Sequence, residues 1–497
     1  MTTRHKEICA GAHALVHEPK CNAAEGRGVL RGVLPVLAAF LLAAMLAGCA
    51  VGPDYRTPEL TIPAHWSAPA DARTLDTLVL AHWWREFNDP LLNELVSAAL
   101  AANLDLSTAR AQLREARARR DMSGARLGPM LDGALSGSRT TSSAQSGTGS
   151  TRKLYSAGFD ASWEPDIFGE VRRSVEAAAA DVDASAESLR DTRVSLVAEV
   201  VLNYVDLRTA ERRLVVTEAS VAERSETYEL TRWRAQAGLV SELDVAQART
   251  NLESSRAALP ALRTAVTGAQ NRLAVLLGRS PGELRERLYA TAAVPHTDTP
   301  AAAGIPAAVL HLRPDVRSAE RRLAAQTARL GEAEAARYPS FRLSGSIGLE
   351  ALTFSSLGDS GADTRSLLGS VTAPIFHSGS ILANIEVQDA LLQQTRLAYE
   401  ATVLTALEEV ENALEGVVNA KQRRAQLELA TAAAREAHTI AEQRYTSGLI
   451  DFLAVLDSQR TLFNLEDQLA SSTGDLATAQ IQLFKALGGG WSPADDV

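Results

Sequence analysis

The fold of this chain is decided by the stretch VRRSVEAAAADVDASAESLRDTRVSLVAEVVLNYVDLRTAERRLVVTEASVAERSETYELTRWRAQAGLV, residues 171–240, and by its return to residue 277. Residues 172–237 contain neither proline nor glycine, so one helix of about 100 Å is predicted at 1.5 Å per residue. Apolar residues recur every seven positions in both limbs: Leu207, Leu214, Val221 and Tyr228 in the first, and Leu259/Leu262, Val266/Ala269 and Leu273/Leu276 in the second. Because such heptads form the seams of coiled coils, we predict an antiparallel helical pair with its tip near Gly238.

The chain contains this rod twice. Residues 237–240 (AGLV) are matched by residues 447–450 (SGLI), at an offset of 210 residues. The same offset relates further pairs of identical residues: Asp105 and Asp315, Leu113 and Leu323, Pro129 and Pro339, and Gly278 and Gly488. We therefore predict a duplicated unit of helix, two short β segments, long helix, tip and returning helix.

The repeat divides the chain into segments. We predict a lipoprotein signal peptide (1–48), an N-terminal anchor and equatorial segment (49–90), a first repeat (91–278), an equatorial belt segment (279–313), a second repeat (314–488) and a C-terminal tail (489–497). The belt is inferred from prolines that interrupt the helical pattern between the repeats. A flexible linker between two domains is the alternative for this segment.

The start of the chain has the features of an export signal. An apolar run over residues 29–47 has Arg27 and Arg31 at its beginning and ends in LAGC at residues 46–49. LAGC has the pattern of a bacterial lipobox, so we predict that Cys49 becomes the first mature residue and carries a lipid anchor. An aspartate after the cysteine would favour retention in the inner membrane. Because this position is Ala50, the outer membrane is the expected location. A buried cysteine in an N-terminal helix is the alternative.

Composition excludes several classes of function. Aromatic residues make up only 5% of the chain, which suits long packed helices better than thick globular cores. The formal net charge is −10, and an acidic chain argues against nucleic acid as a partner. Removal of the signal would take Cys9 and Cys21 with it, so no disulfide is expected within the mature chain. We find no phosphate-binding loop and no nucleophile elbow, and predict no enzyme. No metal site is predicted either, because the mature histidines are scattered without metal-ligand spacing: His65, His82, His296, His311, His377 and His438.

Four short segments alternate apolar and polar residues with a period of two. The clearest are residues 155–165 and 341–351, and a weaker pair covers residues 131–139 and 367–375. Each has about the length of a tilted strand that crosses a bilayer, with one apolar and one polar face. A pair of soluble hairpins is the alternative.

Four strands are too few to close a barrel, and an open edge cannot lie in lipid. If these strands span the membrane, the chain must therefore oligomerise. Two copies would give eight strands with a filled interior, whereas three would give twelve strands with room for a pore. The long helices favour the larger ring, since a conduit needs a lumen.

Several motifs occur in an order that resembles the outer-membrane factor lipoproteins, the TolC- and OprM-like channels that include NodT-type efflux proteins. The motifs are CAVGPDYRTP (49–58), WWREFNDPLL (83–92), WEPDIFG (163–169), RPDVRSAE (313–320), PIFHSG (374–379) and RYTSG (444–448). The resemblance covers nearly the whole mature chain. It departs from the pattern at the first tip, where Trp233, Arg234 and Ala235 stand in place of the arginine–tyrosine pair of the second.

The resemblance implies a mainly α fold with membrane β structure: a trimeric twelve-stranded barrel, four strands per chain, continued by a periplasmic tunnel of coiled coils. It implies a lipid-anchored outer-membrane protein without a cofactor other than the lipid on Cys49. The implied function is passive exit of drugs or other small molecules from an inner-membrane pump of the resistance-nodulation-division kind, through a periplasmic adaptor. A duct for ABC-driven protein secretion and an envelope scaffold without a pore are the alternatives.

The resemblance also assigns roles to residues of the second tip. Leu453 and Asp457 lie four apart, on one face of the returning helix. Three copies would give a leucine ring that narrows the pore and an acidic ring that favours cations. Arg460 is expected to pair with a neighbouring carboxylate and to latch the closed state. An ordinary solvated aspartate and a coiled-coil leucine are the alternative.

The tips themselves are the expected contacts with the adaptor's helical hairpin. In the second tip these are Arg444, Tyr445 and Gly448, and in the first tip Gly238. Both glycines can take the left-handed backbone conformation that reverses the chain.

Overall fold

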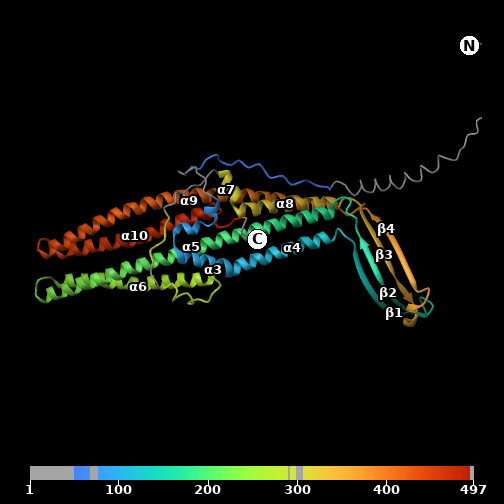
Figure 1. Ribbon diagram of the computed structural model, residues 1–497, viewed down its shortest axis with the longest axis horizontal. Coiled ribbons are helices and arrows are strands. Elements are labelled where there is room, and N and C mark those ends of the chain that lie inside the picture. Colours follow the sequence, from blue (N-terminus) through green and yellow to red (C-terminus); the bar gives the residue numbers. More distant parts are fainter. Residues whose placement is uncertain (1–49, 68–76, 289–291, 298–305, 493–497) are drawn as a thin grey trace, which may run out of the picture.

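The computed structural model describes residues 50–67, 77–288, 292–297 and 306–492. The predicted signal peptide and Cys49 lie outside the described residues. Figure 1 shows a long bundle of helices with a β-sheet at one end. In chain order the helices are α2 (Thr77–Ala81), η1 (Trp83–Phe87), α3 (Pro90–Ala102), α4 (Leu104–Ala125), α5 (Glu170–Gln236), α6 (Glu242–Leu276), α7 (Pro306–Leu312), α8 (Pro314–Ala335), η2 (Phe354–Gly358), α9 (Ser380–Thr446) and α10 (Phe452–Ala486). The strands are β1 (Met130–Thr141), β2 (Thr151–Trp163), β3 (Ser340–Ala351) and β4 (Asp363–Thr372).

The predicted duplication is present element by element. The series α4, β1, β2, α5, α6 is repeated as α8, β3, β4, α9, α10. Helices α5 and α9 each have 67 residues, or about 100 Å, and the returning helices α6 and α10 each have 35.

The two tips are built by the same local hydrogen bonds. Gly238 and Gly448 have φ of 72° and 73°, in the left-handed region that glycine enters without steric cost. The amides of Leu239 and Leu449 each donate back to the carbonyl of the residue five positions earlier, at 2.9 Å. These bonds complete a Schellman motif at the end of each long helix and turn the chain into the returning helix.

The coiled-coil seam is more polar than the sequence predicted. In α5, Leu207 is buried as expected, but Leu214, Val221 and Tyr228 are only half-buried. The buried positions in this part of the helix are polar instead: Thr217, Ser220, Arg224 and Thr231. The physical reason is that α5 packs against both α6 and α10. The buried positions of α5 therefore lie between the apolar row that faces α6 and the one that faces α10. The threonine hydroxyls donate to carbonyls of their own helix, which satisfies them without a partner across the seam.

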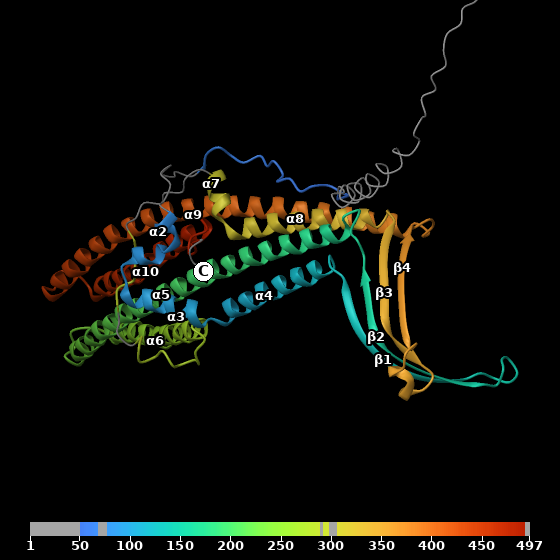
Figure 2. The ribbon, with the colours of Figure 1, turned by 45° about the vertical axis from the view of Figure 1, so that its right-hand side comes forward.

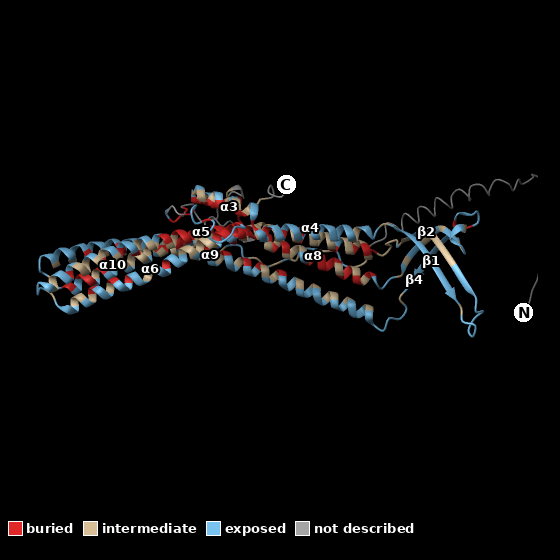
Figure 3. Ribbon diagram, turned by 90° about the horizontal axis from the view of Figure 1, so that it is seen from below, coloured by how far each residue is buried: buried red, intermediate tan, exposed pale blue. Residues whose placement is uncertain are grey.

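A large hydrophobic core lies at the middle of the bundle, where Figure 3 shows buried residues gathered around α3 and α5. Trp83 is fully buried and stacks on Phe484 of α10, with ring centroids 5.1 Å apart. A Cβ on Gly489 would meet the Trp83 ring at 2.9 Å, so the end of α10 closes directly over the N-terminal segment. Elements α2, η1, α3 and residues 281–288 therefore pack against the middle of the long helices in this core.

The strands form one antiparallel sheet in the order β1-β2-β3-β4, which curves away from the helical bundle (Figure 2). Strands β1 and β3 agree with the predicted segments to within two residues. The predictions for the other two strands were shifted toward the C-terminus. Strand β2 spans Thr151–Trp163 where residues 155–165 were predicted, and for the predicted residues 367–375 strand β4 begins at Asp363, which pairs with Leu349, and ends at Thr372. The residues of β4 before Leu367 are polar and do not alternate with apolar ones, so the pattern did not indicate where the strand begins. The strand ends before Pro374, because proline has no amide hydrogen to donate to a neighbouring strand.

One chain leaves much of the sheet without a partner. Large apolar side chains on the strands are exposed, namely Leu131, Leu135, Phe159, Ile347, Leu367 and Val371. Strands β1 and β4 each have one edge that no other strand in the described part of the chain pairs with. Among the described residues, no helix is both apolar and long enough to cross a membrane.

Replacement of Trp83 by alanine should lower the stability of the folded chain by about 3–5 kcal/mol, because it removes a fully buried ring that packs against Phe484. The midpoint of thermal unfolding in detergent, followed by circular dichroism, measures this. Trp233→Ala is the matched control, since that ring is 60% exposed at the first tip and its loss should leave the midpoint nearly unchanged. Equal shifts for the two variants would contradict the assignment of the core.

Candidate functional site

The predicted gate residues lie on one exposed face of α10. Leu453 and Asp457 line a hollow of about 560 Å³ together with residues of α6 from the other repeat: Gln247, Thr250 and Asn251. Leu453 is 56% exposed, so it is not part of the coiled-coil core within one chain.

Arg460 pairs with Asp457 of its own helix, at 2.6 Å between Nη2 and Oδ1. Both side chains are more than 60% exposed, and a solvated pair one turn apart contributes only about 0–1 kcal/mol. Such a pair can separate easily. Within one chain the structure thus gives Arg460 a carboxylate partner, and that partner is Asp457 itself.

The two tips contact each other through Tyr445. Its ring packs near Phe452 at the start of α10, with centroids 5.4 Å apart, and the Arg234 guanidinium from α5 lies 4.6 Å above it. Tyr445 is therefore half-buried, whereas Arg444 and Gly448 are exposed. A Cβ on Gly238 or Gly448 would meet nothing within 4 Å, so only the backbone conformation requires glycine there.

Several apolar side chains at the tips project into solvent. They are Trp233 (60% exposed), Leu239 (73%), Leu243 (65%) and Leu449 (74%). Sequence analysis noted Trp233 only as a departure from the pattern, and missed this shared apolar character. The signal in the sequence is the leucine that directly follows each tip glycine, in Gly238-Leu239 and Gly448-Leu449.

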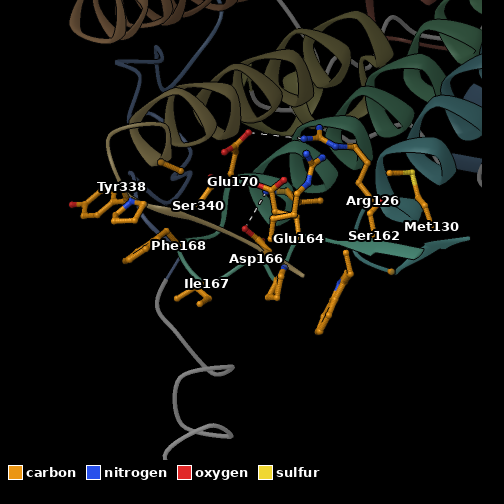
Figure 4. Close-up of a pocket in the computed structure, with 17 residues that line it drawn as sticks. Arg126, Met130, Ser162, Glu164, Asp166, Ile167, Phe168, Glu170, Tyr338 and Ser340 are labelled. Atoms are coloured by element: carbon orange, nitrogen blue, oxygen red, sulfur yellow. Dashed lines mark hydrogen bonds and ion pairs between the residues drawn. The ribbon is translucent and has the colours of Figure 1, made fainter. Parts of the chain in front are cut away.

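At the opposite end, a hollow of about 270 Å³ lies where β2 passes into α5 (Figure 4). The Asp166 carboxylate accepts the backbone amides of Val171, at 3.2 Å, and Arg172, at 2.8 Å, and so caps the start of α5. Burial raises the pKa of Glu170, while the Arg126 guanidinium, 3.9 Å away, acts in the opposite direction. These contacts order the turn between β2 and α5, and we call this junction the collar.

The first described residues are held at the collar. The Val51 amide donates to the Phe168 carbonyl at 3.1 Å. The buried Arg173 donates to the carbonyls of Val51, at 3.0 Å, and Gly52, at 3.1 Å, and pairs with Asp54 at 2.9 Å. Sequence analysis did not single out Arg173, because its partners in this segment lie more than 100 residues away in the chain.

One group of side chains within the described ranges could hold a metal ion. Glu223, His438 and Glu442 each offer one ligand atom, and these atoms lie within 4.8 Å of one another. Sequence analysis predicted no such site.

Comparisons with known proteins agree with this arrangement. The model of the family described as outer membrane efflux protein matches the chain twice, over residues 95–279 and 305–489, again 210 residues apart. The chain is 34% identical to the solvent efflux pump outer membrane protein SrpC of Pseudomonas putida, over 90% of this chain and 97% of that protein. It is 32% identical to Nodulation protein T of Rhizobium leguminosarum bv. trifolii, over 90% of this chain and 96% of that protein. Among solved structures, the outer-membrane channel OprN has a TM-score of 0.83 and 35% identity, covering 90% of this chain and 100% of that one.

Proposed function

Since the chain belongs to the outer membrane efflux protein family, we propose that it is the exit duct of a tripartite efflux system. Three copies close a twelve-stranded barrel in the outer membrane, and their long helices continue it as a tunnel. The protein is a channel and not an enzyme. Relatives named for solvent and antibiotic efflux support drugs and other small molecules as cargo.

The observation that carries this function is that one chain joins an exposed apolar sheet to a pair of very long helices. A sheet with exposed apolar residues and two unpaired edges needs hydrocarbon and neighbouring strands. The collar connects it rigidly to helices of about 100 Å. A scaffold protein would need the helices but not the sheet.

The tips are the surface that we assign to the partners. They are the end of the molecule farthest from the sheet (Figure 1), and they expose apolar side chains with no cover in one chain. A periplasmic adaptor with its own helical hairpin would cover them, and would connect the duct to an inner-membrane pump of the resistance-nodulation-division kind. Arg444, Tyr445, Gly448 and Gly238 shape this surface.

Leu453, Asp457 and Arg460 are the proposed gate. Their exposure on α10 supports this role, because in a closed ring of three chains each side chain would face its own copies. Leucines would exclude water from the axis, and aspartates would set its charge. The weak pair between Asp457 and Arg460 can exchange for contacts with a neighbouring chain.

Cys49 is the proposed site of lipid attachment. Ala50 and Val51 lie at the collar, beside the end of the sheet, which is where a lipid on the preceding residue would reach the bilayer. The grip of Arg173 on this segment would hold the anchor against the barrel.

Cells that make a tip-tagged protein should give a crosslinked adaptor when a photoreactive residue replaces Leu449, which is 74% exposed. Capture of a resistance-nodulation-division pump with the adaptor would support small-molecule efflux, whereas capture of an ABC transporter would redirect the function to secretion. Gly448→Leu should reduce capture, because a left-handed backbone costs a side chain about 1–2 kcal/mol. Gly268→Leu is the control, since that glycine lies on α6 in open space without a positive φ. Absence of any inner-membrane partner would contradict the proposal.

The double variant Leu453→Ala, Asp457→Ala should raise single-channel conductance in planar bilayers, because it removes both the apolar constriction and the charge ring. Leu429→Ala removes a leucine from α9 that is 67% exposed, against 56% for Leu453, and should leave the conductance unchanged. A double variant with the conductance of the original protein would remove these residues from the gate.

Metabolic labelling with an alkyne-bearing fatty acid should mark the original protein but not Cys49→Ser. Cys9→Ser and Cys21→Ser should be labelled normally, since both residues precede the predicted cleavage point. Label that persists in Cys49→Ser would show that the anchor lies elsewhere.

A further inference from the structure

A cluster of nitrogen and oxygen ligands lies between the two repeats, away from the gate face and the collar. His438 and Glu442 are one turn apart on α9, and Glu223 comes from α5, so the ligands join helices that are 215 residues apart in sequence. His438 lies ten residues before Gly448, or about 15 Å above the second tip. The His438 side chain is 8% exposed, whereas Glu223 and Glu442 are 43% and 53% exposed, so the group opens to solvent on its carboxylate side.

The distances fit a small divalent ion. The Nε2 atom of His438 is 3.0 Å from Oε1 of Glu223 and 3.5 Å from Oε1 of Glu442. Zinc binds histidine nitrogen and carboxylate oxygen at about 2.0–2.2 Å, so two ligand atoms at a tetrahedral angle are about 3.3–3.5 Å apart. The observed separations bracket that value.

The surrounding hydrogen bonds prepare Nε2 to bind a cation. The Ser458 hydroxyl donates to the Val455 carbonyl at 2.8 Å, so its oxygen accepts from Nδ1 of His438 at 3.1 Å. In the tautomer with the ring proton on Nδ1, this contact leaves the lone pair of Nε2 facing the two carboxylates, where a cation can bind it. Partners of this kind fix the tautomer and orientation of histidine ligands in metal sites.

Glu223 is oriented in the same way. The amide of Gln459, which is 3% exposed, donates to the Glu223 carboxylate at 2.8 Å. Gln459 and Ser458 both belong to α10, so three helices build the group. The repeat does not duplicate it, because Tyr228 and Arg232 occupy the positions that correspond to His438 and Glu442.

We propose that Glu223, His438 and Glu442 form a binding site for a divalent transition-metal ion of the zinc class, which joins the first repeat to the second near the tips. Three protein ligands and an open side leave a fourth position for water. The competing occupant of Nε2 is a proton. Hydrogen bonding to Glu223 raises the pKa of His438, with further contributions from the Glu442 and Glu466 carboxylates, and a protonated ring would hold the same two carboxylates without a metal.

The test uses the full-length trimer in detergent, purified without a histidine tag and stripped with a chelator. Titration with Zn²⁺ against a chromophoric chelator should show one saturable site per chain. Co²⁺ in its place should give the visible absorption bands of a four-coordinate site. His438→Gln should abolish binding and the absorption. Ser458→Ala should weaken binding by about 10–100-fold while it leaves the ligands intact.

His377→Gln is the matched control, because His377 is an exposed histidine outside the cluster and its loss should not change the titration. Binding that is equal in His438→Gln and the original protein would overturn the proposal. The absence of saturable Zn²⁺ binding in the original trimer would also overturn it. A lower thermal midpoint in His438→Gln would then show that a protonated His438, and not a metal ion, holds the two carboxylates.

Discussion

Along the outer edges of β1 and β4, no strand among the described residues pairs with the backbone amides and carbonyls. In hydrocarbon each unpaired group costs several kcal/mol, so the sheet can lie in a bilayer only when other copies continue it into a closed ring. That requirement determines the rest of the molecule. Closure places the helices that follow the strands around the same axis, and the collar, where Asp166 caps α5, is the junction between the strands and the rods. Apolar residues on the strands are exposed within one chain, and much of the surface of α9 is exposed as well. Both features are consistent with a chain that completes its packing only in the trimer.

Much of this architecture was readable from local patterns. Seven-residue spacing predicted the rods, and glycine at equal offsets predicted the tips and the duplication. Alternation predicted all four strands, two of them to within two residues. Features that arise where three helices meet could not be read in this way. The buried Thr217, Arg224 and Thr231 break the apolar seam because α5 has two neighbours there. His438 and Glu442 show helical spacing, but nothing in the sequence indicates that Glu223 joins them.

The N-terminal segment shows how distant parts of the chain are held in register. Arg173 fixes residues 51–54 at the collar, and Tyr55 and Thr57 then donate to Glu320 on α8, at 3.2 and 3.1 Å. Farther along, Leu60 and Ile62 pack against a small core with Tyr399 and Val403 of α9. The segment thus runs along the outside of the second repeat (Figure 2) and ends near the central core around Trp83. The segment therefore connects the collar to the middle of the bundle.

Duplication within each chain also changes how the assembled ring looks to anything that docks on it. Three chains with two hairpins each present six similar ends, so the ring has an approximate sixfold axis at the tips but only a true threefold axis. The two kinds of end alternate, one with Trp233 and Arg234 and the other with Arg444 and Tyr445. A docking protein can therefore bind as three copies that each span two unlike ends, or as six copies in two alternating environments. In either arrangement a single surface on that protein must accept two different chemistries, or its copies must divide into two sets.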